Sequence, residues 1–190
     1  MPNLSSKAAL FLLAALCAAP ASAHAFWDPV TALCRPPDLE GRASAIDGDT
    51  LELSSPGDVH TVIRLIGVEA PELFQECRDA DGPWSCGRAA RQALEELVGG
   101  RTLACSPCGM APDGTLEATC RADGLDIGAE MLRTGLATTD AFFSNAMHSA
   151  EVSARRAGRG LWRGDWVHPR AWRDGMRLGE EPCRGCSLPQ

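Results

Sequence analysis

Five short strand-like segments, with amphipathic helices after the third and the fifth, predict an α+β fold, namely a five-stranded OB-type β-barrel with about three α-helices. The clearest strand is Val59–Gly67, in which Ile63 and Leu65 share one face while apolar residues also line the other. Apolar residues on both faces suit a strand of a closed barrel with helices packed outside it. The abundance of cysteines adds the expectation that the barrel carries disulfides.

The strands are separated by clear turn signals. Asp47-Gly48-Asp49 predicts the first turn and Pro56-Gly57 the second, whereas residues 106–114, with two prolines and two glycines, predict a longer loop. In order, the predicted strands are Gly41–Ile46, Thr50–Leu53, Val59–Gly67, Arg101–Cys105 and Thr115–Arg121.

Three helices are predicted from apolar stripes bounded by capping residues. The first ends at Gly99-Gly100 and the second at Gly135, because glycine commonly ends helices. A polar, turn-rich insertion, residues 73–84, precedes the first helix. The predicted helices are Cys86–Val98, Ile127–Thr134 and Ala146–Ala157, capped by Ser85, Asp126 and Asn145.

The N-terminal residues have the features of a secretory signal. Lys7 precedes the apolar run Ala8–Ala19, which is too short to span a bilayer, and Ala21-Ser22-Ala23 matches the small-x-small cleavage pattern. A lipid anchor on Cys17 is disfavoured because the preceding residue, Leu16, is too large for that pattern. We therefore expect an exported, periplasmic or secreted protein with no integral membrane segment after signal cleavage.

This interpretation divides the chain into four parts. We predict a signal peptide at residues 1–23, an irregular leader at 24–40, the barrel domain at 41–173 and a C-terminal tail at 174–190. One domain of this size is expected to be a monomer.

The charge of the chain limits how it can contact a polyanion. The formal net charge is −7, so the overall field does not favour non-specific nucleic-acid binding. Any such contact must come from a bound cation or a local arginine cluster. Arginines are concentrated after residue 154, where the alternatives are a solvated surface and a local polyanion contact.

The cysteines predict disulfides in an oxidising compartment. The chain has nine cysteines, and removal of Cys17 with the signal leaves an even number. Cys105 and Cys120 fall on consecutive strands, which allows a cross-strand bridge, and a local bridge between Cys77 and Cys86 is plausible. Two C-x2-C units leave zinc as the alternative. The candidates are Cys34, Cys77, Cys86, Cys105, Cys108, Cys120, Cys183 and Cys186.

Two blocks carry the chemistry of the sequence. Ala45–Thr50 (AIDGDT) and Ile63–Glu72 (IRLIGVEAPE) together place carboxylates and one arginine between core strands. With these blocks, and with further matches at Cys86–Ala90, Ala122–Gly124, Asp126–Ala137 and Gly160–Trp162, the chain resembles the staphylococcal nuclease (thermonuclease) family over roughly residues 42–173.

The resemblance implies a calcium-dependent phosphodiesterase acting on DNA and RNA. By position, Asp49 and Glu69 match calcium-ligating carboxylates and Ala70 matches a ligating carbonyl. Arg64 matches an arginine on the scissile phosphate, and Glu72 matches the glutamate that activates water. Asp47 and Thr50 are expected to support this site.

Three departures from the family pattern favour an altered site. Thr115 stands at the position of a second catalytic arginine, and Glu69 is one methylene longer than the usual aspartate. The chain has no tyrosine, although family members use tyrosines around the nucleotide. We expect a thermonuclease-like enzyme with a partly degenerate site. The alternatives are a non-catalytic OB-fold module that binds nucleic acid or a protein partner, and a zinc-knuckle protein.

Overall fold

The computed structural model of the chain describes residues 34–140 and 144–179. Its main sheet has the strand order β3-β2-β1-β7-β8-β9, and β3 also pairs with β8, which closes the barrel. These strands are β1 (Leu39–Ala45), β2 (Thr50–Ser55), β3 (Val59–Leu65), β7 (Thr102–Met110), β8 (Leu116–Ala122) and β9 (Leu125–Asp126). The predicted α+β, five-stranded OB-type barrel with several helices and disulfides is confirmed.

The closure sets the register of the barrel. β3 and β8 run parallel, with Ile63 opposite Leu116 and Arg64 opposite Glu117. Alternate residues of β3 face inward, so Ile63 and Leu65 are buried in the core while Val62 is exposed. The expectation that both faces of this strand would be covered is therefore wrong for Val62.

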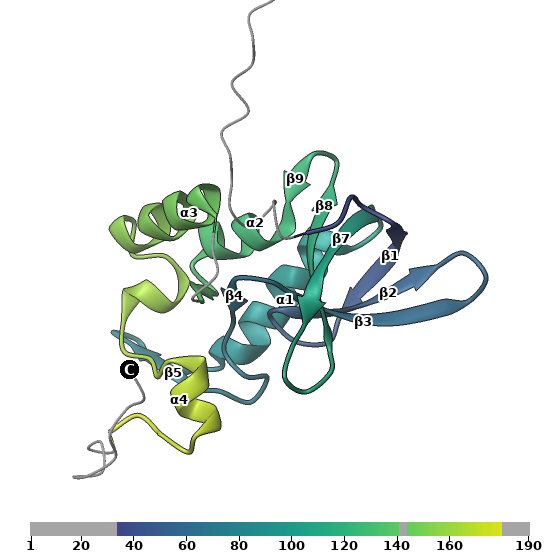
Figure 1. The fold of residues 1–190 in the computed structure, drawn as a ribbon. Coiled ribbons are helices and arrows are strands. Elements are labelled where there is room, and N and C mark those ends of the chain that lie inside the picture. The colour runs from purple at the N-terminus through teal and green to yellow at the C-terminus, as the bar shows by residue number, and fades with distance from the viewer. Residues whose placement is uncertain (1–33, 141–143, 180–190) are drawn as a thin grey trace, which may run out of the picture.

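The helices cover the barrel on one side. They are α1 (Cys86–Val98), α2 (Ile127–Thr134), α3 (Asn145–Arg156) and the short α4 (Pro169–Arg173), with a 3-10 turn η1 (Gly160–Arg163) before α4. In Figure 1, α2 and α3 lie side by side, and α4 lies near β5, far from the β2–β3 hairpin. No described helix has the length and apolar character needed to cross a membrane.

Local capping explains most of the helix boundaries. The Asp126 side chain accepts a hydrogen bond from Ala129 N, and Gly135 ends α2 with a left-handed backbone, as predicted. Ser85 was expected to cap α1, but its hydroxyl instead accepts a hydrogen bond from Arg88. Ser144, not Asn145, caps α3, because its hydroxyl accepts from Met147 N.

The predicted loop at residues 106–114 is largely strand. β7 continues to Met110, with a register shift between Pro107 and Gly109, because Ser106 and Pro107 stay paired with β8. The Cys34–Cys108 disulfide ties the start of the described chain to this extended strand. The insertion before α1 likewise contains a small hairpin, β5 (Cys77–Asp79) and β6 (Gly82–Trp84).

Three disulfides lie within the described residues, and they join Cys34 to Cys108, Cys77 to Cys86, and Cys105 to Cys120. The cross-strand and local bridges expected from the sequence are therefore present. Because Cys105 and Cys108 belong to different disulfides, the first C-x2-C unit is not a zinc knuckle. Cys183 and Cys186 lie outside the described residues.

Candidate functional site

The turn between β1 and β2 is built by an aspartate and a glycine. Asp47 Oδ1 accepts hydrogen bonds from the backbone N–H groups of Asp49 (3.0 Å) and Thr50 (2.8 Å), which fixes the turn. A Cβ on Gly48 would lie 2.6 Å from the Cβ atoms of both Ala70 and Ala90. Only glycine therefore lets this turn pack against α1 and the segment after β4 (Val68–Glu69).

That packing buries the Asp49 carboxylate. It is 9% exposed, and its oxygens accept hydrogen bonds from the Thr50 hydroxyl and the Ala70 N–H, both at 2.9 Å. Burial and the neighbouring Asp47 charge raise the pKa of Asp49 to about 7, although the bonds from Ala70 and Thr50 act in the opposite sense. A carboxylate in this state is poorly compensated by positive charge.

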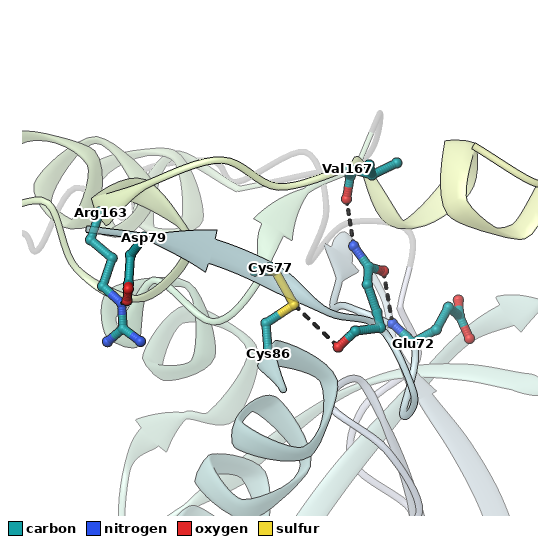
Figure 2. The surroundings of a disulfide bond; sticks show 7 residues. Glu72, Cys77, Asp79, Cys86, Arg163 and Val167 are labelled. Atoms are coloured by element: carbon teal, nitrogen blue, oxygen red, sulfur yellow. Dashed lines mark hydrogen bonds and ion pairs between the residues drawn. A yellow bond between two sulfur atoms is a disulfide. The ribbon is translucent and has the colours of Figure 1, made fainter. Parts of the chain in front are cut away.

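The segment carrying Glu69 and Glu72 is fixed from two sides. β4 pairs with β10 (Thr138–Thr139), whose two hydroxyls donate to the buried Glu151 carboxylate at 2.6 and 2.7 Å. On the other side, the Glu72 N–H donates to Gln75 Oε1 at 3.2 Å. Gln75 is fully buried, and its Nε2 donates to the Val167 carbonyl at 2.6 Å (Figure 2).

Arg173, the last residue of α4, bridges the two glutamates. Its guanidinium donates to Glu72 Oε1 at 2.7 Å and to Glu69 Oε2 at 2.8 Å. Partial burial lowers the pKa of Arg173, but the bonds with Glu72 and Glu69 outweigh this and raise it, so the group is a fixed cation. The sequence did not single out Arg173 among the C-terminal arginines. The signal that could have pointed to such a partner is the scarcity of positively charged residues near Glu69 and Glu72 in the sequence.

Arg64 has a carboxylate partner outside the two sequence blocks. It pairs with Asp113 of the β7–β8 loop, at 3.4 Å between Nη2 and Oδ2. The other Asp113 oxygen accepts the Thr115 N–H at 2.9 Å. Bonds from the backbone and side chain of Thr115, together with the Arg64 charge, hold the pKa of Asp113 below its usual range. Thr115 thus lies in the loop that reaches Arg64.

The predicted site residues therefore form two groups of interacting side chains. In the first group, hydrogen bonds connect the Asp47–Thr50 turn to Ala70. The same segment carries Glu69 and Glu72, which Arg173 bridges. The second joins Arg64 to Asp113 beside Thr115. Asp113 and Arg173 are the residues that the sequence analysis missed.

Comparison with known families shows to which family the chain belongs. Residues 62–164 match the family model described as staphylococcal nuclease homologue. The chain belongs to this family. The expected resemblance, drawn from the two acidic blocks and the helix motifs, is confirmed.

The chain is also similar to two proteins with different names. The chain is 34% identical over 146 residues to the succinoglycan biosynthesis protein ExoI of Rhizobium meliloti (strain 1021), covering 75% of this chain and 73% of that protein. It is 31% identical over 135 residues to the probable endonuclease LCL3 of Paracoccidioides brasiliensis (strain Pb03), covering 60% of this chain and 39% of that protein.

The donor atoms of this nuclease homologue fit calcium in kind. The carboxylates of Asp49 and Glu69 and the carbonyl of Ala70 offer the hard oxygen atoms that calcium prefers. Burial and then the Asp47 charge raise the pKa of Asp49, and a nearby cation would favour its ionised form. Among the described side chains, no three of His, Cys, Asp or Glu gather closely enough to hold a metal alone.

Proposed function

We propose that this protein hydrolyses phosphodiester bonds of DNA or RNA at the site formed by Asp49, Arg64, Glu69 and Glu72. The observation that carries the proposal is the contact between Asp49 Oδ2 and the Ala70 N–H, which brings a buried carboxylate beside the Glu69–Glu72 segment. Membership of the nuclease homologue family and the likeness to a protein named a probable endonuclease support the same reading.

The residues have distinct roles in this reaction. Asp49, Glu69 and the Ala70 carbonyl would hold calcium, which would supply a Lewis acid for a phosphoryl oxygen. Arg64 exchanges Asp113 for the phosphate, since a guanidinium can bond two phosphate oxygens at once. Glu72 takes a proton from the attacking water, whose oxygen forms the new P–O bond. The bond to the leaving oxygen then breaks, and that oxygen is protonated from solvent.

Export is part of the same proposal. Three disulfides within the described residues are compatible with a periplasmic or secreted protein, because such bonds persist in oxidising compartments. Nucleic acid from outside the cell would then be the substrate, and a monomer would suffice.

A second candidate is a non-catalytic module that binds nucleic acid or a protein partner. It is favoured by the pairing of Arg64 with Asp113 and of Glu72 with Arg173, because each predicted catalytic group already has a partner of opposite charge. Thr115, at the position of the second arginine, also favours a non-catalytic module.

Hydrolysis of single-stranded DNA by the purified protein separates the two candidates. We expect cleavage with calcium, loss of cleavage with a chelator, and a loss of about 100-fold or more in Glu72→Gln, because a positioned base contributes roughly that factor. Glu96→Gln, on an exposed face of α1, is the control for removing one carboxylate. Activity that survives chelation or Glu72→Gln would contradict the proposed mechanism, and no cleavage under any condition would favour the binding module.

A further inference from the structure

The C-terminal helix α4 places one guanidinium directly at the proposed catalytic carboxylates. Arg173 contacts Glu72 and Glu69 at 2.7 and 2.8 Å, although more than a hundred residues of chain separate it from Glu69. The two contacts are charge-assisted and use both terminal nitrogens of the guanidinium.

Several contacts hold the chain before α4 against the segment after Glu72. The backbones of Arg78 and Asp165 exchange two hydrogen bonds, at 2.9 and 2.7 Å, and Arg163 pairs with Asp79 at 2.7 Å. In the view of Figure 2, the Arg163–Asp79 pair and Val167 flank the Cys77–Cys86 disulfide, with the pair at the left and Val167 at the right. Leu161 and the two cysteines form a small second core, on which Trp84 and Trp166 pack. The approach of α4 is therefore fixed by structure well outside Arg173 itself.

The neighbouring arginines have other partners than Arg173. Arg170, on the same helix, pairs with Asp140 at 3.5 Å, and Arg163 stacks over the Trp84 ring. Arg155 pairs with Glu151 and stacks over Trp162. Within the described ranges 34–140 and 144–179, Arg173 is the cation whose ion pairs are made with Glu69 and Glu72.

In the family resemblance, Arg64 is the one arginine that matches a phosphate-binding position. Arg64 is paired with Asp113, and the position resembling that of a second catalytic arginine is Thr115. A guanidinium has five N–H donors, so two bonds to glutamates leave others able to reach a phosphate oxygen. The Arg173 side chain is 43% exposed and therefore accessible to such a ligand.

We propose that Arg173 is the second phosphate-contacting arginine of this site, supplied by α4 in place of the arginine missing at Thr115. The proposal rests on the proposed function and deepens it. Its ionic bonds to Glu69 and Glu72 hold the guanidinium in position before substrate arrives, and its remaining donors bind the scissile phosphate. The C-terminal helix thereby becomes part of the active site.

The test compares four variants for two readouts, which are hydrolysis of single-stranded DNA with calcium and binding of a fluorescent phosphorothioate oligonucleotide by anisotropy. Arg173→Gln is expected to lose about 100-fold in hydrolysis, as when one preorganised donor is removed, and about 10-fold in binding. Arg173→Lys should be intermediate, because it keeps the charge and loses the planar fork. The matched control, Arg170→Gln, removes the same charge from the same helix and should change neither readout more than about two-fold.

The fourth variant tests whether an arginine at position 115 can replace Arg173. Adding Thr115→Arg to Arg173→Gln should restore hydrolysis by about 10-fold or more over Arg173→Gln alone, since the charge returns at the position that the family resemblance indicates.

Equal or faster hydrolysis and equal or tighter binding by Arg173→Gln would overturn the proposal, because the contact would then be only structural or inhibitory. If the wild-type protein does not cleave DNA, the proposed function fails, but unchanged or weakened oligonucleotide binding in Arg173→Gln still decides the role of Arg173. Comparable melting temperatures show that the variants are folded, and Arg173→Lys carries the binding test if Arg173→Gln is not.

Discussion

Asp49 is the residue at which folding and function conflict most clearly. Its carboxylate is 9% exposed and lies beside Asp47, and burial with that neighbouring charge raises its pKa to about 7. A buried, poorly compensated carboxylate lowers the stability of the native state whenever it is ionised. A bound cation would offset this loss of stability, which gives a physical reason for a buried carboxylate at this position.

The raised pKa predicts a pH-dependent gain from Asp49→Asn. Below the unfolded pKa of 3.8 the carboxyl is protonated in both states and imposes no penalty; as the pH rises to about 7, the unfolded state ionises first and the native state is increasingly penalised. Without calcium, Asp49→Asn should therefore raise the free energy of unfolding at pH 8 by on the order of 2–4 kcal/mol more than at pH 4. Urea unfolding at both pH values measures this difference, and an equal effect at the two would contradict it.

Charge was the part of the site that the sequence predicted least well. Asp49, Arg64, Glu69 and Glu72 could be named because they stand in short motifs of fixed spacing. The partners of three of them could not, because Asp113 reaches Arg64 from a different strand pair and Arg173 reaches Glu69 and Glu72 across the molecule. Such pairs depend on tertiary contacts that no local pattern contains.

Among the elements, α1 has a direct structural link to the proposed base. Its first turn carries Gly87, where a Cβ would lie 1.8 Å from the Glu72 carbonyl oxygen. The backbone of Glu72 therefore lies so close to the start of α1 that only glycine fits at position 87.

We predict that Gly87→Ala displaces the Glu72 segment. The added methyl cannot fit beside a backbone carbonyl, so the free energy of unfolding should fall by about 1–3 kcal/mol, as for other overpacked sites. A shift of the base by about 1 Å should also lower DNA hydrolysis roughly 100-fold. Gly109→Ala, where nothing lies within 4 Å, is the matched control. Normal hydrolysis in Gly87→Ala would show that Glu72 does not depend on this contact.

The accuracy of the element predictions followed the strength of local signals. α1 and α2 have the predicted bounds because apolar stripes and terminal glycines define both. β7 was predicted to end at Cys105, but it continues to Met110, since pairing with β8 outweighs the turn preference of Pro107 and Gly109. The β5–β6 hairpin was missed because its strands are only three residues long.

At the scale of the whole molecule, an acidic protein is proposed to bind a polyanion. The net charge of −7 opposes long-range attraction, so affinity must come from a few local contacts and a bound cation. The proposed contacts, Arg64 and Arg173, both bind the scissile phosphate, so they neutralise about one phosphate.

This small number predicts a shallow salt dependence. Each phosphate neutralised on a single strand contributes about −0.7 to the slope of log K against log salt, so one neutralised phosphate gives a slope of about −0.7. Titration of a fluorescent oligonucleotide at several salt concentrations and fixed calcium measures the slope, and Arg173→Gln should not make it steeper. A slope steeper than about −4 would mean that further C-terminal arginines contact the strand.

The buried amide of Gln75 has a consequence for where this protein can be shortened. It bonds the Glu72 N–H on one side and the Val167 carbonyl on the other, yet the family match ends at residue 164. A chain cut at that boundary would leave the amide donor of a fully buried side chain without its acceptor, at a cost of about 1–3 kcal/mol, and would also remove Arg173. A fragment that keeps both this buried bond and Arg173 must therefore extend through α4, beyond the residues that the family model matches.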